Sequence, residues 1–447
     1  VDIACYYQLN DKSVSFSLPK GYNKSLPLYI DPTLIFSTYS GSTSDNWGYT
    51  ATYDSDGHAY GGGTSFGSGY PTTMGAYDVN YSAGGCDMVI TKFDDTGSNL
   101  LFSTYLGGSG VDVPHSLVCN SFDQLIVLGT TGSSNFATTP LAFDTTFDGG
   151  SQYLLTTLIN YVNGSDITLS KFSEDGTQLY NSTYIGGSGN DGLNSASNLR
   201  YNYADEVRGE VMVDEFDAIY VASSTYSQDF PMVGNGFQLT NNGQQDGVVF
   251  KMSSSMDGMF WSSYIGGSGN DAVYNLSVSQ QANLYIAGGT TSNDLPVSID
   301  AYQQNYQGGS ADGFIGYINT AGTQLLACTY YGSPQYDQVY FVDEDLDYGV
   351  YVLGQTSAGG STFIYNAPWN QPGGRQWVSQ VSKLLKTVTF STAFGNASNP
   401  GPDISPTSFM VDYCGGLYIA GWGGGLNTFG GTSGLPVTSN AYQTTTD

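Results

Sequence analysis

A short phrase that alternates large and small side chains and ends in tyrosine recurs along this chain of 447 residues. Its last position falls at residues 39, 105, 184, 264, 330 and 393, so the copies are separated by 66, 79, 80, 66 and 63 residues. Phe102-Ser103-Thr104-Tyr105 is a clear copy, and alanine replaces tyrosine in the last one. The alternation is typical of a half-buried β-strand. The sequence therefore predicts one structural unit repeated along the chain.

Three more strand-like segments accompany each tyrosine-ended phrase. One is short and weakly apolar, as at Leu276-Ser277-Val278, and the next is apolar on both faces, as at Leu284-Tyr285-Ile286-Ala287-Gly288. The third begins with Asp and in three copies ends with Lys, which we expect to pair locally; its copies are Asp87–Lys92, Asp166–Lys171, Asp246–Lys251 and the variant Asp312–Tyr317. Four strands in each unit of roughly 65 to 80 residues predict a propeller blade with long loops.

We therefore predict an all-β fold, a β-propeller of six or seven four-stranded antiparallel blades over residues 32–447. Five blades are complete in the sequence, and a sixth begins near Phe409. Two alternatives remain for its outer strand. Residues 34–39 close the ring by joining that blade, or the natural chain continues past Asp447 and adds a blade.

Residues 1–31 contain no copy of the repeat. Two strands are expected there, at 14–18 and 26–30, with a turn at Lys20-Gly21-Tyr22-Asn23. We interpret this segment as the tail of a preceding β domain or as a pair of docking strands.

The charge balance restricts the partners of the chain. It has 39 acidic residues against 11 Lys and Arg, a formal net charge of −28, and nucleic acids bind clustered cations, so a nucleic acid partner is excluded. The same charge attracts Ca²⁺ or cationic partners. No run reaches the roughly 18 apolar residues needed to cross a bilayer, so no transmembrane segment is predicted. The five cysteines form no C-x-x-C pair, which argues against a zinc ribbon.

Several ordered motifs resemble the bacterial SBBP-type β-propeller repeat over roughly residues 32–447. They are Phe102–Asp112, Asp229-Phe230-Pro231, Asp246–Lys251, Gly288-Gly289-Thr290 and Ala301-Tyr302-Gln303. The segments Leu26–Thr38 and Asp412–Tyr418 are similar to parts of the large secreted and surface proteins of Bacteroidota. The resemblance implies a secreted or surface-displayed propeller, export by type IX secretion and further adhesion-type domains, with no established catalytic residues.

A series of aspartates follows the tyrosine-ended strands. Four of them come four residues after the Gly of a Gly-Ser pair and the fifth comes five residues after it; they are Asp45, Asp112, Asp191, Asp271 and Asp337. Loops at this place lie on one rim of a propeller, so these carboxylates are the predicted ligand-binding residues. The alternative is that each accepts backbone N–H bonds and fixes its turn.

A second acidic segment places carboxylates at alternate positions, at Asp343, Asp345 and Asp347. Calcium loops need hard oxygen ligands at such spacing, so Ca²⁺ is the one cofactor considered for this chain. The segment departs from an EF-hand because its Gly comes one place late and no Glu stands at the twelfth position.

The sequence gives little support to known catalytic arrangements. Only two histidines, His58 and His115, and three arginines are present, which leaves a histidine-based triad or a sialidase-type arginine cluster hard to assemble. Aromatic residues at Tyr201-Asn202-Tyr203 and in the tract 369–377 are candidates for stacking on sugar rings. Insertions at 144–165 and 192–208 lengthen two repeats and are the expected places for special function.

We therefore predict a non-catalytic module, not an enzyme, that acts outside the cell or at the bacterial cell surface. Its rigid blades would hold rim loops that bind protein or glycan, as a scaffold or an adhesin. Two alternatives stay open: a structural subunit of an extracellular assembly, which would self-associate, and a carbohydrate-active enzyme that uses the rim carboxylates.

Overall fold

The computed structural model describes residues 6–10, 13–17, 20, 36–156, 158–347, 349–399, 401–412, 415–423, 434–438, 441, 443 and 445. These residues form 26 β-strands and two short 3-10 turns, η1 (Ser197–Leu199) and η2 (Asp205–Val207). No helix in this part of the chain has the length and apolar character required to span a membrane.

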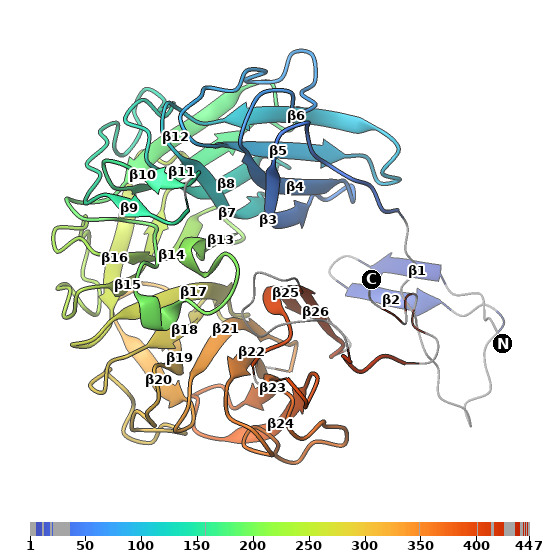
Figure 1. The fold of residues 1–447 in the computed structure, drawn as a ribbon, viewed down its shortest axis with the longest axis vertical. Helices are drawn as coiled ribbons and strands as arrows, with labels where there is room; N and C mark the ends of the chain where they lie inside the picture. Colours follow the sequence, from blue (N-terminus) through green and yellow to red (C-terminus); the bar gives the residue numbers. More distant parts are fainter. Residues whose placement is uncertain are drawn as a thin grey trace.

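The strands are arranged as a propeller around a central channel (Figure 1). Five antiparallel sheets of four strands follow one another along the chain. Blade 1 is β3 (Asn46–Tyr53), β4 (Ala59–Ser65), β5 (Asp87–Phe93) and β6 (Leu100–Leu106); blade 2 is β7 (Asp112–Cys119), β8 (Leu125–Thr131), β11 (Asp166–Phe172) and β12 (Leu179–Ile185); blade 3 is β13 (Glu210–Val213), β14 (Ile219–Thr225), β15 (Asp246–Met252) and β16 (Met259–Ile265); blade 4 is β17 (Asp271–Val278), β18 (Leu284–Thr290), β19 (Asp312–Ile318) and β20 (Leu325–Tyr331); blade 5 is β21 (Asp337–Glu344), β22 (Val350–Thr356), β23 (Gln376–Val381) and β24 (Val388–Phe394).

A sixth sheet has two strands in the described part of the chain, β25 (Ser405–Val411) and β26 (Leu417–Trp422), which we call blade 6. The prediction of an all-β propeller of four-stranded antiparallel blades is confirmed. The described residues 36–40 form no strand, although the sequence predicted an outer strand over 34–39. The ring of Phe36 nevertheless lies over Gly97 in blade 1, as the ring of Phe102 lies over Gly176 in blade 2.

Two smaller hairpins complete the structure. β1 (Tyr6–Asn10) pairs with β2 (Ser13–Ser17), which covers most of the strand predicted at 14–18. The other strand predicted near the N-terminus, at 26–30, lies outside the described residues. β9 (Tyr153–Leu154) pairs with β10 (Asn160–Tyr161) inside the insertion at 144–165.

The recurring tyrosine ends the outer strand and anchors it to its own blade. The hydroxyls of Tyr184, Tyr264 and Tyr330 donate to the backbone carbonyls of Ser133, Ser227 and Ser292, at 2.8, 2.9 and 2.9 Å. The rings of these tyrosines are buried. A buried hydroxyl needs a partner, and the repeated bond explains why tyrosine rather than phenylalanine recurs at this position.

Tyr264→Phe is expected to lower the free energy of unfolding by about 1–2 kcal/mol, because the carbonyl of Ser227 then stays buried without its donor. Tyr39→Phe is the matched control. Tyr39 occupies the same place in the repeat but is fully exposed, so its loss of a hydroxyl should change stability by less than about 0.5 kcal/mol. Urea unfolding followed by tryptophan fluorescence compares the two variants, and equal effects would contradict the anchoring role.

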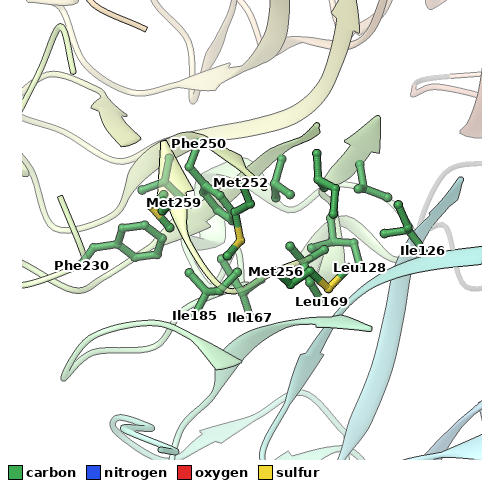
Figure 2. Packing of buried hydrophobic residues seen from close by; sticks show 14 of the residues in the cluster. Ile126, Leu128, Ile167, Leu169, Ile185, Phe230, Phe250, Met252, Met256 and Met259 are labelled. Atoms are coloured by element: carbon green, nitrogen blue, oxygen red, sulfur yellow. The ribbon is translucent and has the colours of Figure 1, made fainter. Parts of the chain in front are cut away.

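Neighbouring blades share their hydrophobic core. Figure 2 shows one layer in which Ile126, Leu128, Ile167 and Leu169 of blade 2 pack with side chains of blade 3 that include Phe250, Met252, Met256 and Met259. Each blade is too thin to bury its own faces, so stability comes from this stacking. As a result, the innermost strands β3, β7, β13, β17, β21 and β25 lie next to one another in this order.

The strand-end lysines pair locally as expected in two blades. Lys92 Nζ lies 2.9 Å from Asp54 Oδ2, and Lys251 Nζ lies 3.0 Å from Asp214 Oδ2. Lys171 instead donates to the carbonyl of Ser254 in the next blade, at 2.6 Å. These cations are therefore engaged in joining strands and blades.

Candidate active site in the central channel

The innermost strands carry a β-bulge at the same place in five blades. In β3, β7, β17, β21 and β25 the pairing register skips one residue, and the skipped residues are Tyr49, His115, Tyr274, Tyr340 and Thr407. Bulges redirect side chains, and they are frequent next to active sites. In blade 3, the position equivalent to the skipped residues is Gly209, and β13 begins immediately after it, at Glu210.

The residues that follow the bulges form a layer across the channel, one from each blade, which we call the central ring. Glu210 belongs to it because Glu210 pairs with Ala222 as Asn275 pairs with Ala287. Its members are Thr50, Ser116, Glu210, Asn275, Phe341 and Ser408. All six line a pocket of about 600 Å³, a size that suits a ligand of a few sugar units.

Glu210 is the one carboxylate among the described residues that line this pocket. Its Oε1 atom accepts a hydrogen bond from the Ser116 hydroxyl, and its Oε2 atom accepts one from Asn275 Nδ2 at 2.8 Å. Its removal from water raises the pKa of Glu210 to about 7, although these hydrogen bonds oppose the shift. At neutral pH the carboxyl group is thus poised between its acid and its carboxylate form.

The insertion at 192–208 crosses the channel, and we call it the cross-channel insertion. Tyr203 packs on Tyr49 of blade 1 with ring centroids 5.9 Å apart, and on Trp422 of blade 6 at 5.0 Å. Asn202 Nδ2 donates to Tyr340 Oη and Gln355 Oε1 of blade 5, at 2.8 and 2.7 Å. These contacts hold the insertion against three distant blades, and its residues Tyr203, Ala204, Val207 and Arg208 line the pocket.

Arg208 ends the cross-channel insertion and fixes it with an internal ion pair. Its Nε atom donates to Asp205 Oδ1 at 2.7 Å, and its Nη2 atom donates to the carbonyl of Pro406 at 3.0 Å. Its guanidinium also lies 4.5 Å from the ring centre of Tyr340. The Oδ2 atom of Asp205 accepts bonds from two backbone N–H groups, those of Tyr201 and Asn202. The charge of Arg208 is therefore already matched within the wall.

Aromatic side chains supply much of the remaining surface. Tyr49, Tyr203, Tyr274, Phe341 and Trp422 all line the pocket. Rigid aromatic rings with polar edges pack well against the apolar faces of sugar rings. Of the two tyrosines in the segment Tyr201-Asn202-Tyr203, which were candidates for stacking on sugar rings, Tyr203 lines the pocket.

The other aromatic candidates lie elsewhere. Tyr201 stacks on Tyr336 at 4.3 Å between ring centroids. In the tract 369–377, Trp377 is fully buried against Phe363 in the core, whereas the half-exposed Trp369 is absent from the pocket wall.

The aspartates predicted to bind a ligand at the rim lie inside the turns between blades. Asp112, Asp191 and Asp271 each accept a bond of 2.8 Å from the backbone N–H of the Gly four residues earlier, and each also accepts bonds from a Thr and a Ser hydroxyl. Asp337 accepts bonds of 2.6 Å from both the backbone N–H and the hydroxyl of Ser333, which stands four residues earlier. All four are buried, as the turn-fixing alternative requires.

Asp45 does not share this arrangement. It is exposed, and the residue that starts β3 in blade 1 is Asn46, which pairs with Ser65 as Asp112 pairs with Thr131. The equivalent of the buried aspartates in blade 1 is therefore Asn46.

Each buried turn aspartate faces a second aspartate, at the start of the third strand of the preceding blade. A Cβ added at Gly107 would lie 2.8 Å from both Asp87 Oδ1 and Asp112 Oδ2, so the two carboxyl groups face one point. The other pairs are Asp166 with Asp191, Asp246 with Asp271, and Asp312 with Asp337. In three of the four pairs, Oδ1 of the first aspartate (Asp87, Asp246 and Asp312) is buried without a hydrogen-bond donor.

The carboxylates considered for Ca²⁺ point to separate partners. Asp343 accepts bonds from the Ser277 hydroxyl and from the backbone N–H of Val411, whereas Asp345 caps the backbone N–H groups of Asp347 and Gly349. In the described part of the chain no three His, Cys, Asp or Glu side chains gather in a way that could hold a metal ion. Asp343 lies in β21, and a backbone hydrogen bond of 2.9 Å from Asp345 to Gly349 closes the connection to β22.

Sequence reasoning missed Glu210. The available signal was the alignment of the repeats. Glu210 is the first residue of β13 and pairs with Ala222 of β14, as Asn275 pairs with Ala287 in blade 4. It is the one ionisable member of the central ring, and it lies two residues after the end of the insertion at 192–208.

No protein-family model matches this chain, and no curated protein matches it in sequence. Solved structures with a similar arrangement exist. They include the NanB sialidase from Streptococcus pneumoniae (9% identity, TM-score 0.42, 94% of this chain and 72% of that chain), a protein of unknown function from Dyadobacter fermentans (11%, 0.37, 85% and 95%) and an ulvan lyase from a new family of polysaccharide lyases (8%, 0.33, 77% and 70%). At these identities the likeness shows the fold alone.

This comparison corrects the prediction of a non-catalytic adhesion or scaffold module that is not an enzyme. Two of the three similar structures are a sialidase and an ulvan lyase, so a propeller of this kind does not exclude catalysis. The carboxylates predicted at the rim accept hydrogen bonds within their own turns, whereas Glu210 lies in the central pocket.

Proposed function

We propose that this chain is a carbohydrate-active enzyme that cleaves glycans in the central pocket, with Glu210 as the proton donor. The observation that supports this most is a carboxyl group with a pKa of about 7 in a pocket walled by aromatic rings. A general acid works best when its pKa lies near the working pH, because enough of it is protonated and it still gives up its proton readily.

The reaction we propose is hydrolysis of a glycosidic bond. Glu210 donates its proton to the bridging oxygen as the bond between that oxygen and the anomeric carbon breaks. Water then adds its hydroxyl to the anomeric carbon, and the remaining proton of that water restores the acid. Ser116 and Asn275 hold the carboxyl group in one orientation from the two neighbouring blades, so the acid is placed before the substrate arrives.

We further propose that the chain acts outside the cell, at the surface of a bacterium. Its formal net charge of −28 suits a soluble extracellular surface, and its motifs resemble the SBBP-type repeats of secreted Bacteroidota proteins. The partner proposed for this setting is a glycan.

The test is a cleavage screen with the purified chain. Polysaccharides of different backbones are incubated with wild-type protein, with Glu210→Gln and with Glu215→Gln, and new reducing ends and loss of polymer size are measured. Glu215 is an exposed glutamate in the same blade, so its variant controls for the loss of one charge. Cleavage by wild type and Glu215→Gln but not by Glu210→Gln is expected. Absence of cleavage of every polymer by wild type would overturn the proposal.

A further inference from the structure

We propose that the outer edge of blade 5 carries a second glycan-binding surface, in which the exposed rings of Tyr365 and Trp369 stack on the sugar rings of a polysaccharide. The surface lies at β24, the outermost strand of the blade, away from the central channel (Figure 1). The choice of a glycan as its ligand rests on the proposed function. Three observations support the surface: the identity of the two residues, their attachment to β24, and a third aromatic ring beside them.

The first observation is that blade 5 differs from the other complete blades at two equivalent positions. In each of these blades the connection between the second and third strands runs along the outermost strand. One residue of the connection shares a backbone hydrogen bond with the second residue of the tyrosine-ended phrase. Tyr365 holds this place in blade 5, whereas the other blades have small side chains there, at Thr73, Thr139, Val233 and Ser298.

The second position lies a few residues further along the same connection. Its backbone carbonyl accepts a bond from the hydroxyl of the phrase's third residue. Trp369 holds this place in blade 5, whereas the other blades have acidic or amide side chains there, at Asp78, Asp144, Gln238 and Gln303. Four blades fold without an aromatic ring at either position, so folding does not require the two rings. Tyr365 is 60% and Trp369 54% exposed, and a ligand that covers such large rings removes apolar surface from water.

The second observation is that both residues are fixed to the strand. Tyr365 exchanges two backbone hydrogen bonds with Ser391, at 2.8 and 2.7 Å. The carbonyl of Trp369 accepts its bond from Thr392 at 2.6 Å. Because Ser391 and Thr392 are consecutive residues of β24, the two aromatic residues are neighbours on one strand edge. Side chains carried by a fixed backbone lose less conformational freedom when a ligand binds.

The third observation is another exposed ring next to Tyr365. Tyr302 of blade 4 is 42% exposed. Burial, together with the nearby hydroxyl of Tyr365, raises the pKa of Tyr302, which places the two side chains close together. The ring of Tyr302 lies 5.4 Å from that of Tyr331, and Tyr331 stacks on the buried Trp377 at 4.6 Å. The surface is therefore continuous with an aromatic stack that reaches into the core.

The chemistry of this surface suits a chain of β-1,4-linked glucose or xylose units. Pyranose rings whose hydroxyls are equatorial present apolar C–H faces, which pack against aromatic rings. The phenol hydroxyls, the indole N–H and the exposed amides of Asn366 and Asn370 are partners for the sugar hydroxyls at the ring edges. Because the surface faces away from the central pocket, it would hold the chain on a polymer and raise the local concentration of substrate.

Affinity electrophoresis in native gels tests this surface apart from catalysis. Gels that contain hydroxyethylcellulose, xyloglucan or xylan are run with Glu210→Gln, which should not cleave them, and with the same protein carrying Tyr365→Ser and Trp369→Gln. These replacements are the residues of blade 4 at the two positions, so the fold should tolerate them. We expect at least one polymer to retard the first protein and to bind the second at least about tenfold more weakly. Phe216→Ser removes an exposed ring from a turn of blade 3 and should leave the retardation unchanged.

Trp369 also provides a spectroscopic readout, because it is the one exposed tryptophan of the five in the chain. Bound polymer should reduce the quenching of wild-type tryptophan fluorescence by acrylamide and should have no such effect on Trp369→Gln. Unchanged quenching in a retarded protein, or equal retardation with and without the two aromatic rings, would place the polymer elsewhere and overturn the inference.

The remaining outcomes separate this inference from the proposed function. If none of the three polymers retards the protein, the surface does not bind them and the inference fails, even where wild type cleaves short oligosaccharides. If light scattering shows that wild type self-associates through these rings, the surface joins two copies of the chain and the inference is wrong. Retardation that depends on the two rings, without cleavage of any glycan by wild type, would support the surface and overturn the enzymatic proposal alone.

Discussion

Glu210→Gln is expected to lower the turnover of glycan cleavage by about 10²–10⁴-fold, the usual contribution of a positioned general acid. Glutamine keeps the shape of the side chain and can still bond to Ser116 and Asn275, but it has no proton to give to the bridging oxygen. Substrate affinity should change little, so the loss should fall on kcat rather than on KM.

The pH profile gives this result a second check. Because the pKa of Glu210 is raised to about 7, the acid form is present below that pH, and wild-type kcat should fall about tenfold per pH unit above it. Glu215→Gln should keep the wild-type profile. A Glu210→Gln variant that retains more than a tenth of the activity, or a profile that rises with pH, would contradict the assigned role.

The wild-type chain is expected to be more stable at pH 5.0 than at pH 7.5, by about 2 kcal/mol for each aspartate pair at the blade junctions. Asp246 shows the reason. Its burial and the nearby carboxyl group of Asp271 raise the pKa of Asp246 to about 7. Its Oδ1 atom, which no donor reaches, is the natural place for the bound proton.

The direction follows from the two states of the chain. Below about pH 4 an aspartate is protonated in both the folded and the unfolded chain, so folding pays no penalty. Between about pH 4 and 7 the unfolded chain releases that proton while the folded chain retains it, and stability falls with rising pH. Above the folded pKa both forms are ionised and the loss is complete. Self-repulsion of a chain with a net charge of −28 acts in the same direction.

Asp246→Asn should remove the share of one pair from this pH dependence and stabilise the chain at pH 7.5. Urea unfolding at both pH values measures it. Asp347→Asn, at an exposed position, removes the same charge without touching a pair and should leave the difference between the two pH values unchanged. Equal pH dependence in wild type and Asp246→Asn would show that the pair holds no proton in the folded chain.

The strands were predictable because every repeat contains the same strand-like segments in the same order. The tyrosine-ended phrases and the apolar runs correspond to β6 and β8, β12 and β14, and so on around the ring. Repetition makes such a prediction strong, since an error in one copy is corrected by the others.

The central ring was not predictable in the same way, because a bulge inserts one residue without changing the apolar pattern. Aligning the weak inner strands by apolar content places Val211 opposite Ser116, whereas pairing in the sheet places Glu210 there. In an alignment by apolar content, the position of the central ring in blade 3 is therefore shifted by one residue, and Glu210 does not align with the other five members. The cross-channel insertion was recognised as a place of interest, but its hydrogen-bond partners in blades 1, 5 and 6 are 135 or more residues away in sequence.

The rim carboxylates illustrate a second difficulty of prediction from repeats. Recurrence at a fixed spacing made the turn aspartates conspicuous, yet recurrence in a repeat protein first reflects what every blade needs in order to fold. The residue with the distinctive chemistry is the one that differs from its counterparts, as Glu210 differs from Ser116 and Asn275.

The cross-channel insertion also bears on how the molecule comes apart. Stacked repeats ordinarily unravel from their ends, because each unit touches only its neighbours. Here a single side chain, Tyr203, contacts both blade 1 and blade 6, through Tyr49 and Trp422. Tyr203 thereby couples the stability of two blades that are far apart in the sequence. The array should therefore melt in one cooperative transition, and it should refold slowly, since this link forms only after the intervening blades are in place.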